Sequence, residues 1–162
     1  MFLANEILDM AMQFEKNGAA VYRRAMDKVS DPVLGALLEW MADEEHRHAK
    51  SFSSLKEKAA AGGDAPFSSQ LTRDLLDEMI GEQSFSLEEV DFSTLEDQDD
   101  LIRTFIEFER DTIIFYEMLT PFIEDPETRA TLETIIDEEN SHVARLAALL
   151  ENEEKRPALS GC

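Results

Sequence analysis

Apolar residues recur three and four positions apart over four long stretches of the chain, which is the spacing of one face of an α-helix. Asparagine and aspartate are good N-caps, and proline fits the first helical position. These signals predict helices that begin near Asn5, at Asp31-Pro32, between Asp97 and Asp100, and at Asp125-Pro126, with a shorter helix from Leu71 to Ile80. No run of alternating β-branched residues marks a strand, so the sequence predicts an all-α protein.

The two halves of the sequence match one another at an offset of 94 residues. Matching positions include Phe14 and Phe108, Tyr22 and Tyr116, Asp31-Pro32 and Asp125-Pro126, Asp43-Glu44-Glu45 and Asp137-Glu138-Glu139, and His48 and His142. Each half is therefore predicted to form a helix hairpin, over 5–61 and 97–156. A long crossover over 62–96 would join the hairpins into an antiparallel four-helix bundle. We expect one domain over 1–157, followed by a short tail at 158–162.

The chain is strongly acidic, with 15 Lys and Arg against 36 Asp and Glu and a net charge of -21. Such a surface repels phosphate groups, so neither nucleic acid nor a membrane is expected as a partner. The single cysteine, Cys162, excludes an intramolecular disulfide and any paired-cysteine metal site. The first residues lack a basic region, and no apolar run approaches the length that spans a bilayer. We therefore expect a cytoplasmic protein.

Six polar residues that repeat between the halves lie on the apolar faces of the predicted helices. In the fourth helix Glu139 and His142 continue the three-and-four spacing of Ile135 and Leu146, so they face the core. The other three predicted helices carry further carboxylates and an imidazole at core-facing positions. The complete set is Glu15, Glu45, His48, Glu109, Glu139 and His142.

Four carboxylates that face one another in a core require either protonation or a cation. Burying them without either costs several kcal/mol each and adds their mutual repulsion. Two divalent metal ions would neutralise the four negative charges. Oxygen and nitrogen ligands of this kind suit iron, manganese or zinc, so the residues predict a site for two such ions.

Two Glu-x-x-His motifs occur in register, each 30 residues after a core-facing glutamate. In this arrangement the sequence resembles the rubrerythrin branch of the ferritin-like di-iron carboxylate superfamily. The resemblance covers both hairpins and implies a ferritin-like bundle that binds two iron ions. It also implies that the six core-facing residues are the metal ligands, with Glu45 and Glu139 bridging the two ions.

The same resemblance implies supporting roles for four neighbouring residues. Tyr22 and Tyr116, one heptad after the glutamates of the first and third helices, match a family tyrosine that donates a hydrogen bond to a ligand carboxylate. Glu44 and Glu138 would accept the N–H of the ligand histidines across the bundle. Plainer interpretations stay open, namely core aromatics for the tyrosines and solvated acids for the two glutamates. Trp40 is predicted to be a core residue.

Two features of rubrerythrin proper are missing from this sequence. Three residues from Glu109, where rubrerythrin has an additional glutamate, this chain has Ile106 and Thr112. The chain also lacks the paired Cys-x-x-Cys motifs of the rubredoxin-type domain that supplies electrons. The expected electron donor is therefore external, either another protein or ferrous iron.

The resemblance implies a rubrerythrin-like peroxidase that reduces hydrogen peroxide or dioxygen in oxidative-stress defence. One alternative is a ferroxidase for iron storage or detoxification, in which Fe(II) is also the substrate. Another is a metal-binding or sensing module without turnover. The expected assembly is a homodimer or a larger homo-oligomer.

Overall fold

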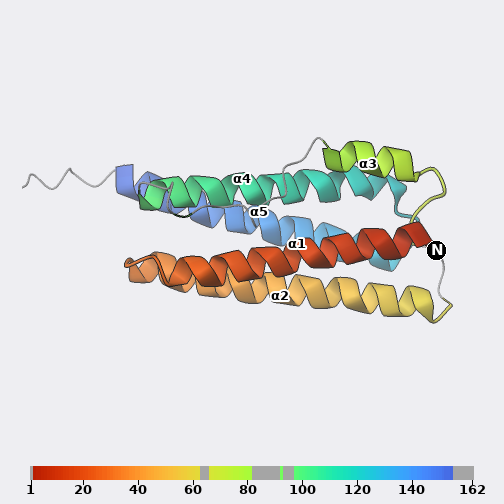
Figure 1. Cartoon of the computed structure of the whole chain (residues 1–162), viewed down its shortest axis with the longest axis horizontal. Coiled ribbons are helices and arrows are strands. Elements are labelled where there is room, and N and C mark those ends of the chain that lie inside the picture. The colour runs from red at the N-terminus through yellow and green to blue at the C-terminus, as the bar shows by residue number, and fades with distance from the viewer. Residues whose placement is uncertain (1, 63–65, 82–91, 93–96, 155–162) are drawn as a thin grey trace, which may run out of the picture.

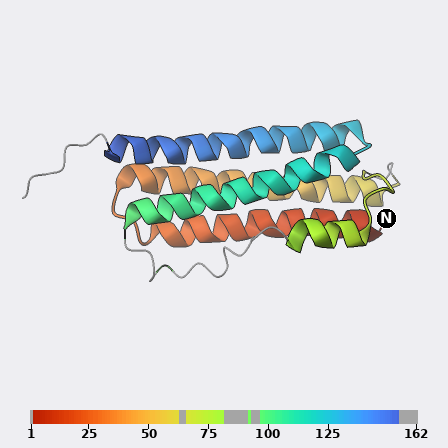
Figure 2. The ribbon, with the colours of Figure 1, turned by 90° about the horizontal axis from the view of Figure 1, so that it is seen from above.

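Four long helices lie side by side along the length of the molecule (Figure 1). They are α1 (Phe2–Met26), α2 (Pro32–Ala60), α4 (Gln98–Leu119) and α5 (Pro126–Glu154). The structure is a computed structural model, and it describes residues 2–62, 66–81, 92 and 97–154. The turned view in Figure 2 shows the same four nearly parallel axes, so the predicted all-α, ferritin-like four-helix bundle is confirmed.

Aspartate side chains cap three of the four long helices where the sequence predicts. Asp31 accepts a hydrogen bond from the backbone N–H of Val33 at 2.9 Å, immediately before Pro32 at the first position of α2. Asp125 caps α5 in the same way, through the backbone N–H of Thr128 at 2.7 Å. Asp97 caps α4. These caps satisfy backbone donors that have no partner inside the helix, and they define where each helix begins.

The start of α1 differs from the prediction. The helix begins at Phe2, so Asn5 lies inside the first turns and does not cap it. The reason is packing, because Ala4 and Ile7 are already buried on the same face as the rest of the helix. An apolar face that continues toward the N-terminus extends the helix beyond a polar residue that would otherwise favour a cap.

The crossover carries the chain from the end of α2 to the start of α4 at the opposite end of the bundle (Figure 1). Gly62 follows α2 with a φ of 96°, a left-handed conformation that favours glycine and turns the chain away from the helix axis. Beyond it lies α3 (Arg73–Gly81), the short helix that the apolar spacing predicts. Parts of the predicted crossover, 63–65, 82–91 and 93–96, lie outside the described residues, and so does the predicted tail at 158–162.

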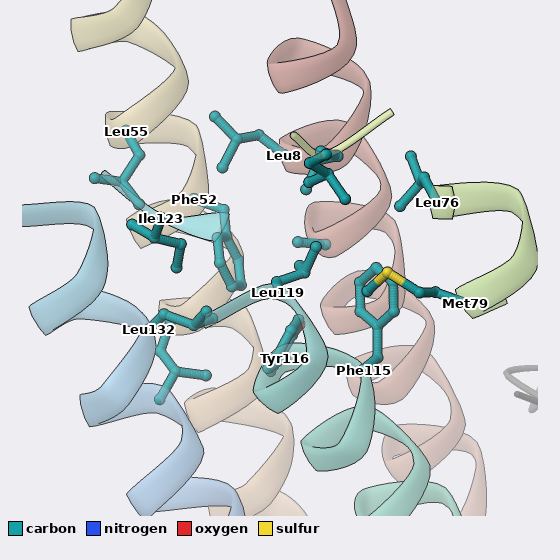
Figure 3. Packing of buried hydrophobic residues seen from close by; sticks show 14 residues of the cluster. Leu8, Phe52, Leu55, Leu76, Met79, Phe115, Tyr116, Leu119, Ile123 and Leu132 are labelled. Carbon is teal, nitrogen blue, oxygen red and sulfur yellow. The ribbon is translucent and has the colours of Figure 1, made fainter. Parts of the chain in front are cut away.

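Buried apolar side chains form two clusters, one toward each end of the bundle. Figure 3 shows the first, to which all five α-helices contribute: Leu8, Phe52, Leu76, Leu119 and Leu132 come from α1, α2, α3, α4 and α5. The second cluster includes Val21, Ala25, Leu34, Leu38, Met41, Ile102, Phe105 and Leu146. Each fully buried side chain of this size stabilises the fold by about 1.5–3 kcal/mol. The layer between the two clusters is polar, and it contains the six residues discussed next. Across the described residues, no helix combines the length and the apolar character needed to cross a membrane.

Candidate metal centre

The middle layer of the bundle brings together all six core-facing polar residues of the sequence pattern. Each of the six is at most 2% exposed. One glutamate comes from each of α1 and α4, and a glutamate and a histidine one turn apart come from each of α2 and α5. In chain order they are Glu15, Glu45, His48, Glu109, Glu139 and His142.

The six residues form two overlapping groups of possible metal ligands. Within each group, one donor atom from every residue lies within 4.8 Å of all the others. The first group is Glu15, Glu45, His48 and Glu139, and the second is Glu45, Glu109, Glu139 and His142. Each group therefore contains three carboxylates and one imidazole, and Glu45 and Glu139 belong to both. This is the geometry of two adjacent cation sites that share two carboxylates.

The two imidazoles turn the same nitrogen toward the carboxylates. Nδ1 of His48 lies 2.9 Å from Oε1 of Glu139 and 3.3 Å from Oε2 of Glu15. Nδ1 of His142 lies 2.8 Å from Oε2 of Glu139 and 3.2 Å from Oε1 of Glu45. The rings are nearly parallel, with centroids 6.1 Å apart. Both Nδ1 atoms therefore point into the centre, and both Nε2 atoms are left for other partners.

In the metal-free chain, the pKa values of the central carboxyl groups are shifted in opposite directions, upward for Glu45 and Glu109 and downward for Glu139. Burial and the charge of Glu139 raise the pKa of both Glu45 and Glu109 well above the usual range. Burial also opposes ionisation of Glu139, but its contacts with His142 and His48 outweigh burial and lower the pKa of that carboxyl. Without metal, therefore, protons neutralise part of the site.

The histidines supply the compensating positive charge in the metal-free chain. Burial alone would lower the pKa of both imidazoles. Contacts with Glu139 and Glu15 outweigh it and raise the pKa of His48 to about 11. Contacts with Glu109 and Glu139 likewise raise the pKa of His142 to about 9. Metal binding would displace these protons, because a ligating imidazole must be neutral.

The donor atoms of the centre fit a pair of divalent metal ions. Within the described part of the chain, no hydrogen bond of suitable angle is formed by Oε1 of Glu45, Oε2 of Glu109, Oε2 of Glu139 or either ring nitrogen of His142, although Nδ1 of His142 lies 2.8 Å from Oε2 of Glu139. A buried polar atom without a partner costs about 1–3 kcal/mol, so five such atoms in one layer need an explanation. Two divalent cations would satisfy the four of these atoms that face the centre, all except Nε2 of His142, and would balance the four carboxylate charges. The mixed oxygen and imidazole donor set suits iron, manganese or zinc.

Two tyrosines hold the outer glutamates in place across the bundle. The hydroxyl of Tyr22 on α1 donates to Oε1 of Glu109 on α4, and the hydroxyl of Tyr116 on α4 donates to Oε1 of Glu15 on α1. Both tyrosines are fully buried. Burial and the adjacent carboxylates raise the pKa of both phenols, which keeps them protonated as donors. The structure therefore shows the tyrosine contacts that the resemblance implies.

The outer nitrogens of the two histidines have different surroundings. Nε2 of His48 lies 2.7 Å from Oε2 of Glu138, across the bundle as expected. The corresponding contact of Glu44 with His142 does not occur, because Glu44 instead forms an ion pair with Arg47 on its own helix. Nε2 of His142 has no hydrogen-bond partner among the described residues.

Trp40 lies against His142, whereas His48 has no such neighbour at the equivalent position, Thr134. The sequence pattern predicts Trp40 only as a core residue. Its ring is half-buried and packs edge-on against the ring of His142, with centroids 5.2 Å apart. The guanidinium of Arg145 also lies over the indole of Trp40, with its central carbon 4.5 Å from the ring centroid. Position 40 corresponds to Thr134 in the second half. A comparison of the two halves for mismatches, as well as for matches, would have identified Trp40.

A four-helix bundle with four carboxylates and two imidazoles in one buried layer defines a class of metal-binding helical bundles. Within that class, the family model described as Rubrerythrin matches residues 6–150. This match covers most of the chain, which therefore belongs to the rubrerythrin family.

Two solved structures share this fold. A hypothetical protein from Pyrococcus furiosus has a TM-score of 0.67 at 21% sequence identity, and the alignment covers 91% of this chain and 88% of that chain. A protein from Thermotoga maritima, assigned as a ferritin-like diiron-carboxylate protein, has a TM-score of 0.64 at 22% identity, with 95% and 96% of the two chains covered. No curated protein matches the chain.

Proposed function

We propose that this protein is a non-haem di-iron protein that reduces hydrogen peroxide or dioxygen with electrons from an external donor. The observation that carries the proposal is the pair of overlapping buried donor groups that share Glu45 and Glu139. Membership of the rubrerythrin family supports it. So does the fold shared with the Thermotoga maritima protein assigned as a diiron-carboxylate protein.

The residues present would hold one ion in each donor group. Glu15 and His48 would bind the first ion and Glu109 and His142 the second, with Glu45 and Glu139 between them. When bound, the iron pair supplies one electron from each ion, so that hydrogen peroxide, two protons and two electrons give two water molecules. The external donor then returns the two electrons.

The surrounding residues position these ligands and keep the centre dry. Tyr22 and Tyr116 hold the carboxylates of Glu109 and Glu15 by hydrogen bonds. Glu138 accepts the Nε2 proton of His48, which leaves Nδ1 of that ring free to bind metal. The two apolar clusters above and below the layer exclude bulk water and strengthen the electrostatic interactions inside it.

A ferroxidase is the second candidate function. The chain carries no Cys-x-x-Cys motif that could bind an electron-transferring iron, and a ferroxidase needs none because Fe(II) is itself the electron donor. The high negative charge of the chain would also raise the local concentration of Fe(II). A metal-binding or sensing module would use the same six residues without turnover.

An anaerobic Fe(II) titration of the metal-free protein, followed by stopped-flow mixing with oxidant, separates these functions. Two Fe(II) per chain, oxidised much faster by peroxide than by dioxygen and re-reduced by an added electron donor, is the result expected of the peroxidase. Faster oxidation by dioxygen with continued uptake of iron would instead establish the ferroxidase. Binding without oxidant-dependent turnover would leave the sensing module.

A matched pair of variants links the result to the site. Glu139→Ala removes a residue of both donor groups, and iron binding should be lost. Glu133→Ala removes an exposed glutamate from the same helix, and binding should be unchanged. Equal iron binding by both variants would overturn the proposed site.

A further inference from the structure

A pocket of about 390 Å³ opens between α2 and α5 and ends on one of the two central histidines. The two helices lie side by side (Figure 2). The lining residues are Arg47, His48, Ser51, Ala130, Thr131, Thr134, Ile135 and Glu138. His48 is the residue that connects this pocket with the centre, because its Nε2 faces Glu138 and its Nδ1 faces Glu15 and Glu139. One imidazole ring therefore separates the pocket from the buried carboxylates.

Two residues of the pocket, His48 and Glu138, form a group of possible cation donors with the adjoining Glu44. One donor atom from each of Glu44, His48 and Glu138 lies within 4.8 Å of the others. The positive charge of Arg47 is balanced by its ion pair with Glu44. Glu138 is 35% exposed, whereas His48 is 2% exposed, so Glu138 reaches from the pocket to the buried ring. Carboxylate oxygens and an imidazole nitrogen are donors that suit a divalent cation.

The equivalent pocket in the other half of the molecule does not reach the central histidine. Shifted by 94 residues, the pocket positions at Ser51, Ala130, Thr131 and Thr134 become Arg145, Ala36, Leu37 and Trp40. These four residues also line a pocket between α2 and α5, together with Val33, Ala148 and Leu149, but His142 is not among its lining residues. The indole of Trp40 lies against His142 and is covered in turn by Arg145. An indole thus lies beside His142, whereas the equivalent residue at the pocket beside His48 is Thr134, with its small side chain.

We propose that the pocket beside His48 is the route by which divalent metal cations reach the centre, and that Trp40 closes the equivalent route beside His142. A cation is first held by the carboxylate of Glu138 beside His48, and it then passes the ring of His48. Both metal positions are loaded from this one side. The inference rests on the proposed function, since it requires a metal pair at the centre.

The rate at which metal-free protein takes up Co(II) tests the route without any measurement of turnover. Thr134 is exposed, so Thr134→Trp places an indole at the mouth of the pocket in imitation of Trp40. We expect this variant to take up Co(II) at least tenfold more slowly in stopped-flow absorbance, with the same final content after gel filtration. Thr131→Trp blocks the same pocket from one turn away and should slow uptake similarly.

Two further variants make the test specific. Ser54→Trp adds the same side chain at an exposed position on α2 outside the pocket, and uptake should stay at the wild-type rate. Trp40→Ala removes the indole beside His142, and in the Thr134→Trp background it should restore the rate at least threefold by opening the second side. Circular dichroism identifies a variant that does not fold, in which case the other pocket variant decides.

Uptake at the wild-type rate by the folded pocket variants would overturn the route. A loss of final Co(II) content in these variants would also overturn it, because Thr134 and Thr131 would then affect the centre and not the access to it. A different result would show that the proposed function is wrong. In that case the wild-type protein itself would not bind two Co(II) per chain.

Discussion

The two hairpins, α1 with α2 and α4 with α5, carry the same ligand residues at the centre. They differ in the residues that surround the two histidines. Glu45 and Glu139 occupy equivalent sequence positions and both belong to the two donor groups. The tyrosine contacts also repeat, each hairpin supplying one hydroxyl to the other. By contrast, Trp40 covers His142, while its equivalent Thr134 leaves His48 at the end of a pocket.

A second mismatch lies inside the centre itself. A Cβ atom at Gly18 would lie 3.2 Å from Oε2 of Glu45 and 3.3 Å from the ring of Phe108. The equivalent position in the second half is Thr112, which is buried and whose hydroxyl has no hydrogen-bond partner among the described residues. The comparison teaches that the repeated residues set the ligand groups, whereas the residues that differ set the space and the access around them.

The largest expected difference between equivalent residues concerns Glu139 and Glu45 in the metal-free protein. Glu139 is ionised between His48 and His142, so Glu139→Gln removes the charge partner of two buried imidazoles and should lower the free energy of unfolding by about 3–5 kcal/mol. Glu45 has a raised pKa and is protonated, so Glu45→Gln should change it by less than about 1 kcal/mol. Urea unfolding of the two metal-free variants measures both values. Equal losses would mean that the halves are electrostatically equivalent after all.

The next largest effect is the pH dependence of the metal-free protein. The pKa values of His48 and His142 are raised in the folded state, so their stabilising contribution is fully present below the ordinary histidine pKa of 6.5 and is lost as the pH rises. His142 loses it by about pH 9 and His48 by about pH 11. The raised pKa values of Glu45 and Glu109 act in the same direction.

The melting temperature of the metal-free protein should therefore fall from pH 6.5 to about 9, and the increase on adding Mn(II) should grow over the same range. Calorimetric melts with and without Mn(II) provide the measurement. A metal-free protein that becomes more stable over this range would contradict the protonation pattern.

The tyrosines test the part of the comparison in which the halves agree. Tyr22→Phe and Tyr116→Phe each leave a buried carboxylate oxygen without its donor, on Glu109 and Glu15 respectively. Each should lower the free energy of unfolding by about 1–3 kcal/mol. Urea unfolding of the two single variants should give values within about 0.5 kcal/mol of each other. A larger difference would mean that the tyrosine contacts also differ between the two halves.

The smallest expected effects are at the helix caps. Asp31→Ala and Asp125→Ala should each cost about 1 kcal/mol, the typical value of an N-cap. Asp125 should cost the more of the two, because its bonds from the backbone N–H and the hydroxyl of Thr128, at 2.7 Å and 2.6 Å, are shorter than those that Asp31 accepts from Val33 and Gln98, at 2.9 Å and 3.1 Å. The bonds from Thr128 lower the pKa of Asp125, so its contribution is present above the ordinary carboxyl pKa and is lost as the pH falls through the lowered value. Thermal melts at neutral and at acidic pH measure both points.

The sequence predicts the helices and the polar layer well because both depend on local periodicity. Residues three or four apart share a helix face whatever the neighbouring helices do, so Glu139 and His142 could be placed on the core side before any packing was known. The caps at Asp31 and Asp125 are equally local. Asn5 shows the limit of local signals, since packing of the apolar face around Ile7 extends α1 past it.

The repeat predicts that equivalent residues of the two halves make equivalent contacts. This prediction is wrong where the two halves pack differently. It implied that Glu44 would accept from His142 as Glu138 does from His48. In the structure Glu44 pairs with Arg47, and the ring of Trp40 lies against His142. These contacts depend on side chains from different helices, and their identities do not follow from the repeated positions.

The sequence by itself determined which residues face the core, that the two halves repeat, and that four carboxylates and two imidazoles lie at one level, because helix periodicity and the 94-residue offset suffice for that. The tertiary structure decided which groups hold protons without metal and which histidine lies beside a pocket. These properties depend on distances of a few ångströms between side chains of different helices. Only the packing of the helices sets such distances.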